Sequence, residues 1–134
     1  MKKGITLIAT ITLVILNIHN ALAQAGSLDM TFNNTGIRLY DFGTQHDAGY
    51  GIVPLSDTTA VILASSYLNG STIGVLYRIS ENSDIDSTFG VDNGYTGFQI
   101  GTATYVQKLL QQPDGKYLVA GTVAVTASNE RFFV

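Results

Sequence analysis

Short runs of alternating hydrophobic and polar residues follow one another along this chain, and turn residues separate them. Such alternation is typical of half-buried β-strands, and no window shows the sustained 3.6-residue period of an amphipathic helix. The run Ala60-Val61-Ile62-Leu63-Ala64 is apolar throughout, which predicts a strand covered on both faces. The first half of the chain therefore predicts strands at residues 37–42, 49–55, 60–64 and 73–79.

The pattern repeats. Leu28-Asp29-Met30-Thr31-Phe32 returns 57 positions later as Ile85-Asp86-Ser87-Thr88-Phe89, and residues 55–64 return at the same offset as residues 112–121. Gly97, at the start of the first strand of the second copy, is the counterpart of Gly36, which precedes the first strand of the first copy. Self-similarity at such a period indicates a solenoid or a propeller. The second copy then predicts strands at residues 97–100, 105–110, 117–120 and 131–134.

We therefore expect an all-β fold of two tandem four-stranded antiparallel repeats that resemble β-propeller blades. The first would span residues 24–83 and the second, which is truncated, residues 84–134. Adding 57 to Arg78 gives a position beyond Val134, so the last strand of the second copy is incomplete. Because repeats bury their faces against neighbours, we expect a fragment of a longer array that is oligomeric or aggregation-prone by itself.

Residues 1–23 have the features of a secretory signal peptide of bacterial type. A basic start precedes an apolar run from Ile5 to Ile18, and Ala21-Leu22-Ala23 supplies small residues for cleavage before Gln24. The alternative is an uncleaved membrane anchor, but the run is shorter than the roughly 20 residues that a spanning helix needs. We expect a secreted or cell-surface protein that makes no membrane contact after cleavage.

Composition narrows the possible partners. The chain has no cysteine, which excludes a lipidated cysteine after the leader and a disulfide framework. Loss of Lys2 and Lys3 with the leader leaves five basic and ten acidic side chains, a net charge of −5. Such a balance predicts no nucleic-acid partner.

Two segments resemble the delta-60 repeat family, whose units carry Leu-Asp-x-Thr-Phe-Gly and, further on, Gln-Pro-Asp-Gly-Lys-x-Leu-Val-Ala-Gly. Residues 85–90 and 112–121 follow this pattern almost throughout, whereas the first copy departs from it at Asn33 and at residues 56–59. The resemblance implies a propeller-like β-repeat of secreted or surface proteins, usually present in many copies, with no assigned activity.

The repeated motif contains the first group of candidate residues. In Asp-x-Thr-Phe, the Asp and Thr side chains suit hydrogen bonds to nearby backbone N–H groups, and the Phe suits a buried anchor. Gln112-Pro113-Asp114-Gly115 has Pro at the second and Gly at the fourth position of a type I turn. Paired carboxylates could instead serve acid–base catalysis, but catalytic residues seldom recur in every repeat. The structural motif comprises Asp29, Thr31, Phe32, Asp86, Thr88, Phe89, Pro113, Asp114 and Gly115.

Metal and hydrolase chemistry have weaker support. Asn82, Asp84 and Asp86 stand at alternate positions like the start of a calcium loop, but the Gly and distal Glu of an EF-hand are missing. His46 is the only histidine after the leader, and no serine stands in a nucleophile elbow, so no zinc site or triad is expected. We predict no cofactor.

The sequence thus predicts an exported β-repeat scaffold or adhesive binding module without catalysis. Its partners would be other repeats of the same array, a surface protein or a polysaccharide. The alternative is the N-terminal part of a secreted propeller hydrolase, with its active site in blades that this sequence does not contain.

Overall fold

The computed structural model describes residues 26–42, 46–56 and 58–134, so the predicted signal peptide lies outside the described residues. Within them, a single 3₁₀ turn, η2 (Phe32–Asn34), precedes the strands. The strands are β1 (Asp47–Pro54), β2 (Ala60–Leu68), β3 (Ser71–Ile79), β4 (Tyr95–Phe98), β5 (Ala103–Gln111), β6 (Tyr117–Thr126) and β7 (Asn129–Phe133). A search of these residues for a helix long and apolar enough to cross a membrane finds none.

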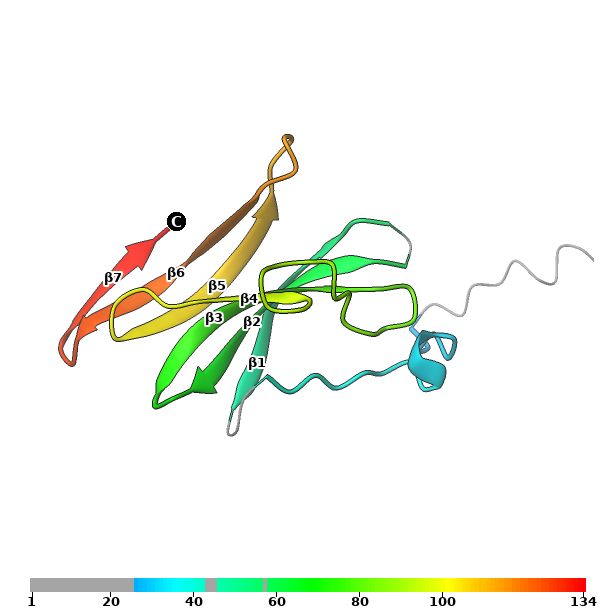
Figure 1. Ribbon diagram of the computed structural model, residues 1–134, viewed down its shortest axis with the longest axis horizontal. Coiled ribbons are helices and arrows are strands. Elements are labelled where there is room, and N and C mark those ends of the chain that lie inside the picture. The colour runs from blue at the N-terminus through cyan, green and yellow to red at the C-terminus, as the bar shows by residue number, and fades with distance from the viewer. Residues whose placement is uncertain (1–25, 43–45, 57) are drawn as a thin grey trace, which may run out of the picture.

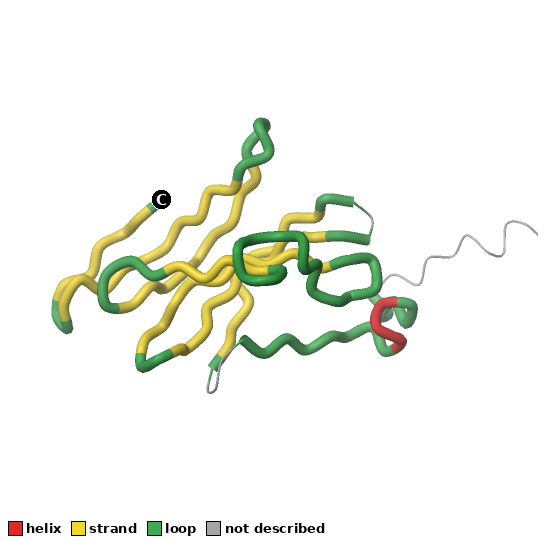
Figure 2. Tube along the Cα trace, viewed as in Figure 1, coloured by secondary structure: helices red, strands yellow, loops and turns green. Residues whose placement is uncertain are grey.

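The strands form two antiparallel sheets. The first has the order β1-β2-β3-β4 and the second the order β5-β6-β7, so each sheet is a meander of neighbouring strands (Figures 1 and 2). Asn69 and Gly70 join β2 to β3 with φ angles of 52° and 86°, the left-handed conformation that two-residue hairpin turns require. The prediction of an all-β fold with antiparallel sheets is confirmed.

Alternation along β2 divides the core into two layers. Val61 and Leu63 are fully buried and pack with Val106 and Leu109 of the second sheet; we call these four residues the intersheet core. The side chains between them point the opposite way, as the pleat of a strand requires. The predicted burial of residues 60–64 on both faces is confirmed.

The opposite side of the first sheet has its own apolar layer. Ala60, Ala64, Val75, Tyr77 and Ile79 form this surface, which we call the N-terminal face. Phe32, Tyr40 and Phe42 from the segment before β1 pack against it, and Figure 1 shows that segment running along this side.

The prediction of a strand at residues 37–42 was wrong. In the described part of the chain this segment is extended but belongs to no sheet, because it lies across a sheet face rather than beside a strand edge. Tyr40 and Phe42 instead place their rings 5.2 and 4.7 Å from the ring of Tyr77.

The prediction that residues 97–100 open the second sheet was also wrong. β4 pairs with β3 in the first sheet, from Gly74 opposite Phe98 to Tyr77 opposite Tyr95. The Asp86 N–H donates to the Arg78 carbonyl (2.8 Å), which folds the connection back along β3 and so places β4 at its free edge. The second sheet accordingly has three strands among the described residues.

The alignment of Gly36 with Gly97 needs correction as well, because Gly94 is the structural counterpart of Gly36. Both have positive φ angles, 74° and 112°. A Cβ at Gly36 would lie 2.6 Å from Cβ of Leu28, and a Cβ at Gly94 would lie 2.3 Å from Cγ2 of Ile85. Leu28 and Ile85 open the two copies of the repeated motif, so both glycines close the same loop.

Candidate functional site

The two copies of the Asp-x-Thr-Phe motif fold into the same turn. In the first, Oδ1 of Asp29 accepts hydrogen bonds from the Thr31 N–H (2.9 Å) and hydroxyl (2.7 Å). In the second, Oδ1 of Asp86 accepts from the Thr88 N–H (2.9 Å) and hydroxyl (2.7 Å). The Phe N–H then donates to the Asp carbonyl at 3.1 Å in the first copy and 3.0 Å in the second. Each carboxylate therefore stabilises its own backbone turn.

These hydrogen bonds also set the acidity of both carboxyl groups. The hydroxyl of Thr31, followed by its N–H, lowers the pKa of Asp29 below the usual value. Thr88 lowers the pKa of Asp86 in the same way, and Arg78 adds a smaller effect. A carboxylate held ionised by several donors is a weak proton acceptor, which is the opposite of what a general base at neutral pH needs.

Arg78 reinforces the second turn and was missed as a site residue in the sequence. Its Nε donates to Oδ2 of Asp86 (2.8 Å), one terminal nitrogen donates to the Thr88 hydroxyl (2.8 Å), and the guanidinium lies 5.3 Å from the ring centroid of Phe89. The available signal was that Arg78 is the one charge in an otherwise uncharged strand. Phe89 is partly buried rather than enclosed, and its ring lies nearly perpendicular to that of Tyr117.

The calcium candidates do not converge. Asp84 pairs with Arg38 (3.2 Å), Asp86 pairs with Arg78 (2.7 Å), and Asn82 is exposed. Within the described ranges, no group of three or more His, Asp or Glu side chains could hold a metal ion. The protein's own arginines thus occupy the positions where a cation would bind the two carboxylates.

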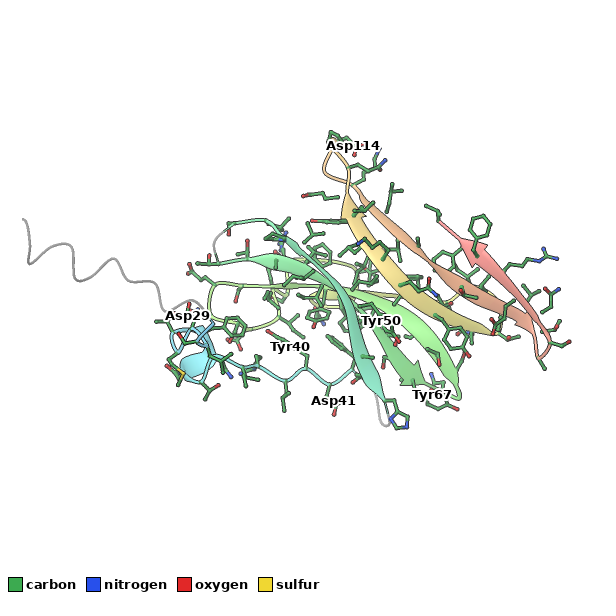
Figure 3. The ribbon with its side chains drawn as sticks, turned by 180° about the vertical axis from the view of Figure 1, so that it is seen from behind. Asp29, Tyr40, Asp41, Tyr50, Tyr67 and Asp114 are labelled. Atoms are coloured by element: carbon green, nitrogen blue, oxygen red, sulfur yellow. The ribbon has the colours of Figure 1, made fainter. Side chains whose placement is uncertain are left out.

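The Pro113-Asp114-Gly115 turn closes the β5–β6 hairpin, far from Asp29 (Figure 3). The Gly115 N–H donates to the Gln112 carbonyl (2.9 Å), so the predicted turn between these residues is present. Nζ of Lys116 donates to Oδ2 of Asp114 (2.8 Å), and this bond, followed by one from the Lys116 N–H, lowers the pKa of Asp114.

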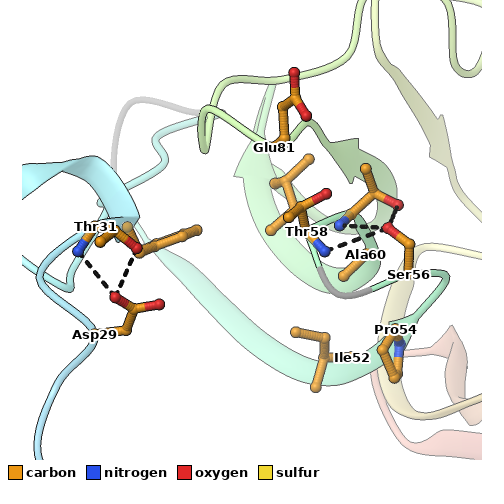
Figure 4. A pocket seen from close by; sticks show the side chains of 11 residues that line it. Asp29, Thr31, Ile52, Pro54, Ser56, Thr58, Ala60 and Glu81 are labelled. Carbon is orange, nitrogen blue, oxygen red and sulfur yellow. Dashed lines mark hydrogen bonds between the residues drawn. The ribbon is translucent and has the colours of Figure 1, made fainter. Parts of the chain in front are cut away.

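A groove lies between the first Asp–Thr turn and the β1–β2 connection. Its volume is about 280 Å³. Apolar side chains line part of it: Phe32, Ile52, Pro54, Ala60 and Ile79. Carboxylates and hydroxyls line the rest: Asp29, Thr31, Ser56, Thr58, Thr59 and Glu81. Figure 4 shows Asp29 and Thr31 on one side of the groove and Ser56 and Thr58 on the other.

Hydrogen bonds fix the hydroxyl side of this groove. Oγ of Ser56 accepts from the N–H groups of Thr59 (3.1 Å) and Thr58 (3.3 Å) and lies 2.8 Å from the Thr59 hydroxyl. This Ser/Thr turn stands where the second copy has Pro113, Asp114 and Gly115. The groove thus presents ordered hydroxyls and two carboxylates beside an apolar surface.

His46 lies at the other end of β1 from this groove. It precedes a strand of eight residues, and Ser56 follows that strand. At about 3.3 Å per residue the strand between them is roughly 25 Å long. His46 and Ser56 therefore do not form a nucleophile–base pair.

Comparison with known proteins finds a similarity that covers the C-terminal hairpin. The sequence model of a β-propeller domain of unknown function (DUF5122) matches residues 112–134, which include β6 and β7. No curated protein matches the chain. No solved structure matches it either. In this stretch the chain is similar to a propeller-like repeat scaffold. Two antiparallel meanders packed face to face agree with that similarity.

Proposed function

We propose that this protein is an exported repeat scaffold of the delta-60 type that binds a neutral polysaccharide through the groove beside Asp29. The observation that carries this proposal is the make-up of the groove, in which fixed hydroxyls and two carboxylates face an apolar surface. Sugars offer hydroxyl groups to such acceptors and donors and present apolar C–H faces to side chains such as Ile52. The acidic net charge of the chain disfavours an acidic polymer.

A binding role without catalysis is further supported by the chemistry of the groove. Hydrolysis by a serine nucleophile needs a base within hydrogen-bond reach, and the hydroxyl of Ser56 is instead beside that of Thr59. Asp29 is held ionised by Thr31, so it is poorly suited to act as an acid.

Binding is tested with soluble neutral glucans by affinity electrophoresis of the purified protein. Thr58→Val and Glu81→Gln should each reduce retardation in the glucan gel, because each removes a polar group of the groove. Glu130→Gln, an exposed site on β7, removes the same charge as Glu81→Gln and is the matched control, and glucan should retard it as much as it retards the original protein. Equal migration of all variants with and without glucan would rule out this ligand class.

Export is tested separately by the mass of the protein recovered outside the cell. The mature chain should begin at Gln24, with Gly26 as the second expected start, because small residues precede each position. A product that retains Met1 would contradict export through a cleaved signal peptide.

A further inference from the structure

We propose that this protein associates head to tail with a second copy of itself. In this arrangement the outer side of the second sheet of one copy packs around Ile52 of the other. Ile52 lies opposite Ile62 at the margin of the N-terminal face, where the segment before β1 leaves it exposed. The segment before β1 in that other copy extends the second sheet along β7. Ile52 also lines the groove beside Asp29, so self-association and polysaccharide binding would compete for this side chain. The test below contains no polysaccharide and therefore reports self-association alone.

The segment before β1 already occupies the position of a fourth strand. The loop that ends at Gly36 corresponds to the loop that ends at Gly94, just before β4. Residues 37–40 therefore correspond to Tyr95–Phe98 at an offset of 58. The Phe42 N–H donates to Asp47 (2.8 Å), just as the Ile100 N–H donates to Thr104 (2.7 Å). Both segments therefore enter the following sheet with the same geometry.

The side chains of the two segments also face the same way. Phe98 of β4 packs into the intersheet core, against the sheet that follows it. Tyr40, its counterpart, packs on the N-terminal face, again against the sheet that follows it. Residues 37–40 thus lie where the last strand of a preceding sheet would lie, and no such sheet is present among the described residues.

The N-terminal face is the counterpart of a surface that is buried elsewhere in the chain. Leu109 of β5 is 5% exposed because the first sheet covers it. Ile52 of β1, 57 positions earlier, is 64% exposed. The irregularity in β1 between Gly49 and Gly51 recurs in β5 between Val106 and Lys108, which confirms the alignment of these strands.

The complementary surface is the outer side of the second sheet. Val61 of β2 is fully buried in the intersheet core, whereas Leu118, its counterpart in β6, is 39% exposed. Leu110 lies opposite Leu118 in the sheet and is also exposed. Leu118 of one copy would therefore pack near Ile52 of the second copy, as Val61 and Leu109 share one buried cluster within the chain.

The strand edges match as well. Gly121 of β6 is the counterpart of Ala64 of β2, 57 positions earlier. Gly121 lies opposite Phe133 and Ala64 lies opposite Val75, so β7 corresponds to β3. The free edge of β3 is covered by β4, but in the described chain β7 pairs with β6 only. Phe132 on β7 is 85% exposed and Leu39 in the extended segment is 88% exposed. Pairing these two segments between copies would satisfy the backbone groups of both.

A second copy is the occupant that these surfaces favour, because each surface is the counterpart of one that already binds its complement inside the chain. The two surfaces differ from each other, so the contact is heterologous and can close into a ring of several copies. A propeller ring holds typically four to eight sheets, and each copy supplies two.

The test is light scattering with size-exclusion chromatography over a range of protein concentrations from about 1 µM upward. The protein should form oligomers that dissociate on dilution. Leu118→Arg and Ile52→Arg should each weaken association roughly thirtyfold or more, because each places a charge at the centre of the contact. Circular dichroism should show that both variants remain folded, since both side chains lie outside the core of a single copy.

Mixing the two variants distinguishes this arrangement from any symmetric contact. The Ile52→Arg protein keeps an intact second sheet, and the Leu118→Arg protein keeps an intact N-terminal face. The mixture should therefore form one-to-one heterodimers that grow no further. Met30→Arg is the matched control. Ser87 is the counterpart of Met30 in the second copy of the motif and is exposed within the chain, so Met30 should stay exposed in the contact between copies. A protein that is monomeric at every concentration, or variants that fail to complement each other, would overturn the proposal.

Discussion

Arg78 stabilises the second Asp–Thr turn through an ion pair, a hydrogen bond to Thr88 and a contact with the ring of Phe89. Arg38 makes a looser pair with Asp84 at 3.2 Å, in which both side chains are more exposed. Exposed ion pairs contribute little to stability, whereas a partly buried Arg with several acceptors contributes more. The two arginines therefore form a matched comparison.

We predict that Arg78→Leu lowers the melting temperature clearly more than Arg38→Leu does. Leucine keeps part of the apolar contact of the Arg stem, so the difference reports the polar contacts. Thermal unfolding followed by circular dichroism measures both values. Equal melting temperatures for the two variants would show that the contacts of Arg78 do not stabilise the fold.

The pH dependence of stability should reflect the carboxylates of the two turns. Because the pKa of Asp86 is lowered in the folded state, its contribution is present above the unfolded pKa of about 3.9 and is lost as pH falls through the folded value. We predict that Asp86→Asn lowers the melting temperature at pH 6 and makes it less sensitive to acid below about pH 4. Asp92→Asn, which replaces an exposed carboxylate in the same loop, is the matched control.

Phe89 packs on the intersheet core while part of its ring remains exposed. An enclosed Phe costs about 3–5 kcal/mol when replaced by Ala, so we predict about 2 kcal/mol for Phe89→Ala. Chemical denaturation measures the change, with Val91→Ala as an exposed control in the same loop. A denaturation midpoint equal to that of the control would show that the ring does not anchor the turn.

At the scale of single residues, the sequence predicted local bonds better than long-range ones. The hydrogen bonds of both turns follow from the spacing in Asp-x-Thr, because the donor and acceptor are two positions apart. The partnership of Arg78 with Asp86 depends on how the connection folds back along β3, and the groove near Glu81 depends on three separate segments. Neither is encoded by a local pattern.

Among the elements, the hydrophobic pattern located the strands but not the sheets to which they belong. Alternation is a property of one segment, so β1, β2, β3, β5, β6 and β7 overlap predicted strands. Residues 37–42 have the same alternation but pack on a sheet face, and β4 joins the first sheet although it follows the second copy of the motif. The loop that precedes each segment decides which sheet the segment contacts. This loop closes at Gly36 in the first copy and at Gly94 in the second.

This closure makes Gly94 sensitive to substitution. Its φ of 112° is unfavourable for any other residue, and an added Cβ would also lie 3.0 Å from the Asp86 carbonyl oxygen. We predict that Gly94→Ala costs roughly 3 kcal/mol of unfolding free energy. Gly70→Ala has a positive φ of 86° but open space around the added atom, so it should cost about 1 kcal/mol. Similar denaturation midpoints for both variants would show that the loop adjusts around the added methyl group.

For the whole molecule, the intersheet core joins the two sheets. Val61 and Leu63 from the first sheet and Val106 and Leu109 from the second are each at most 5% exposed, so neither sheet buries these side chains without the other. Stability of a repeat array is a sum of such contacts between neighbours. The two sheets should therefore unfold together.

Leu63→Ala tests this coupling. Removing a fully buried Leu should cost about 3–5 kcal/mol, because it leaves a cavity between the sheets. If the sheets are coupled, the amides of β6 lose hydrogen-exchange protection together with those of β2, although the substituted residue lies in the first sheet. Leu68→Ala, a substitution of the same type at the exposed end of β2, should change neither strand measurably. Loss of protection confined to β1, β2 and β3 would show instead that each sheet unfolds independently, and that the intersheet core joins two separately stable units.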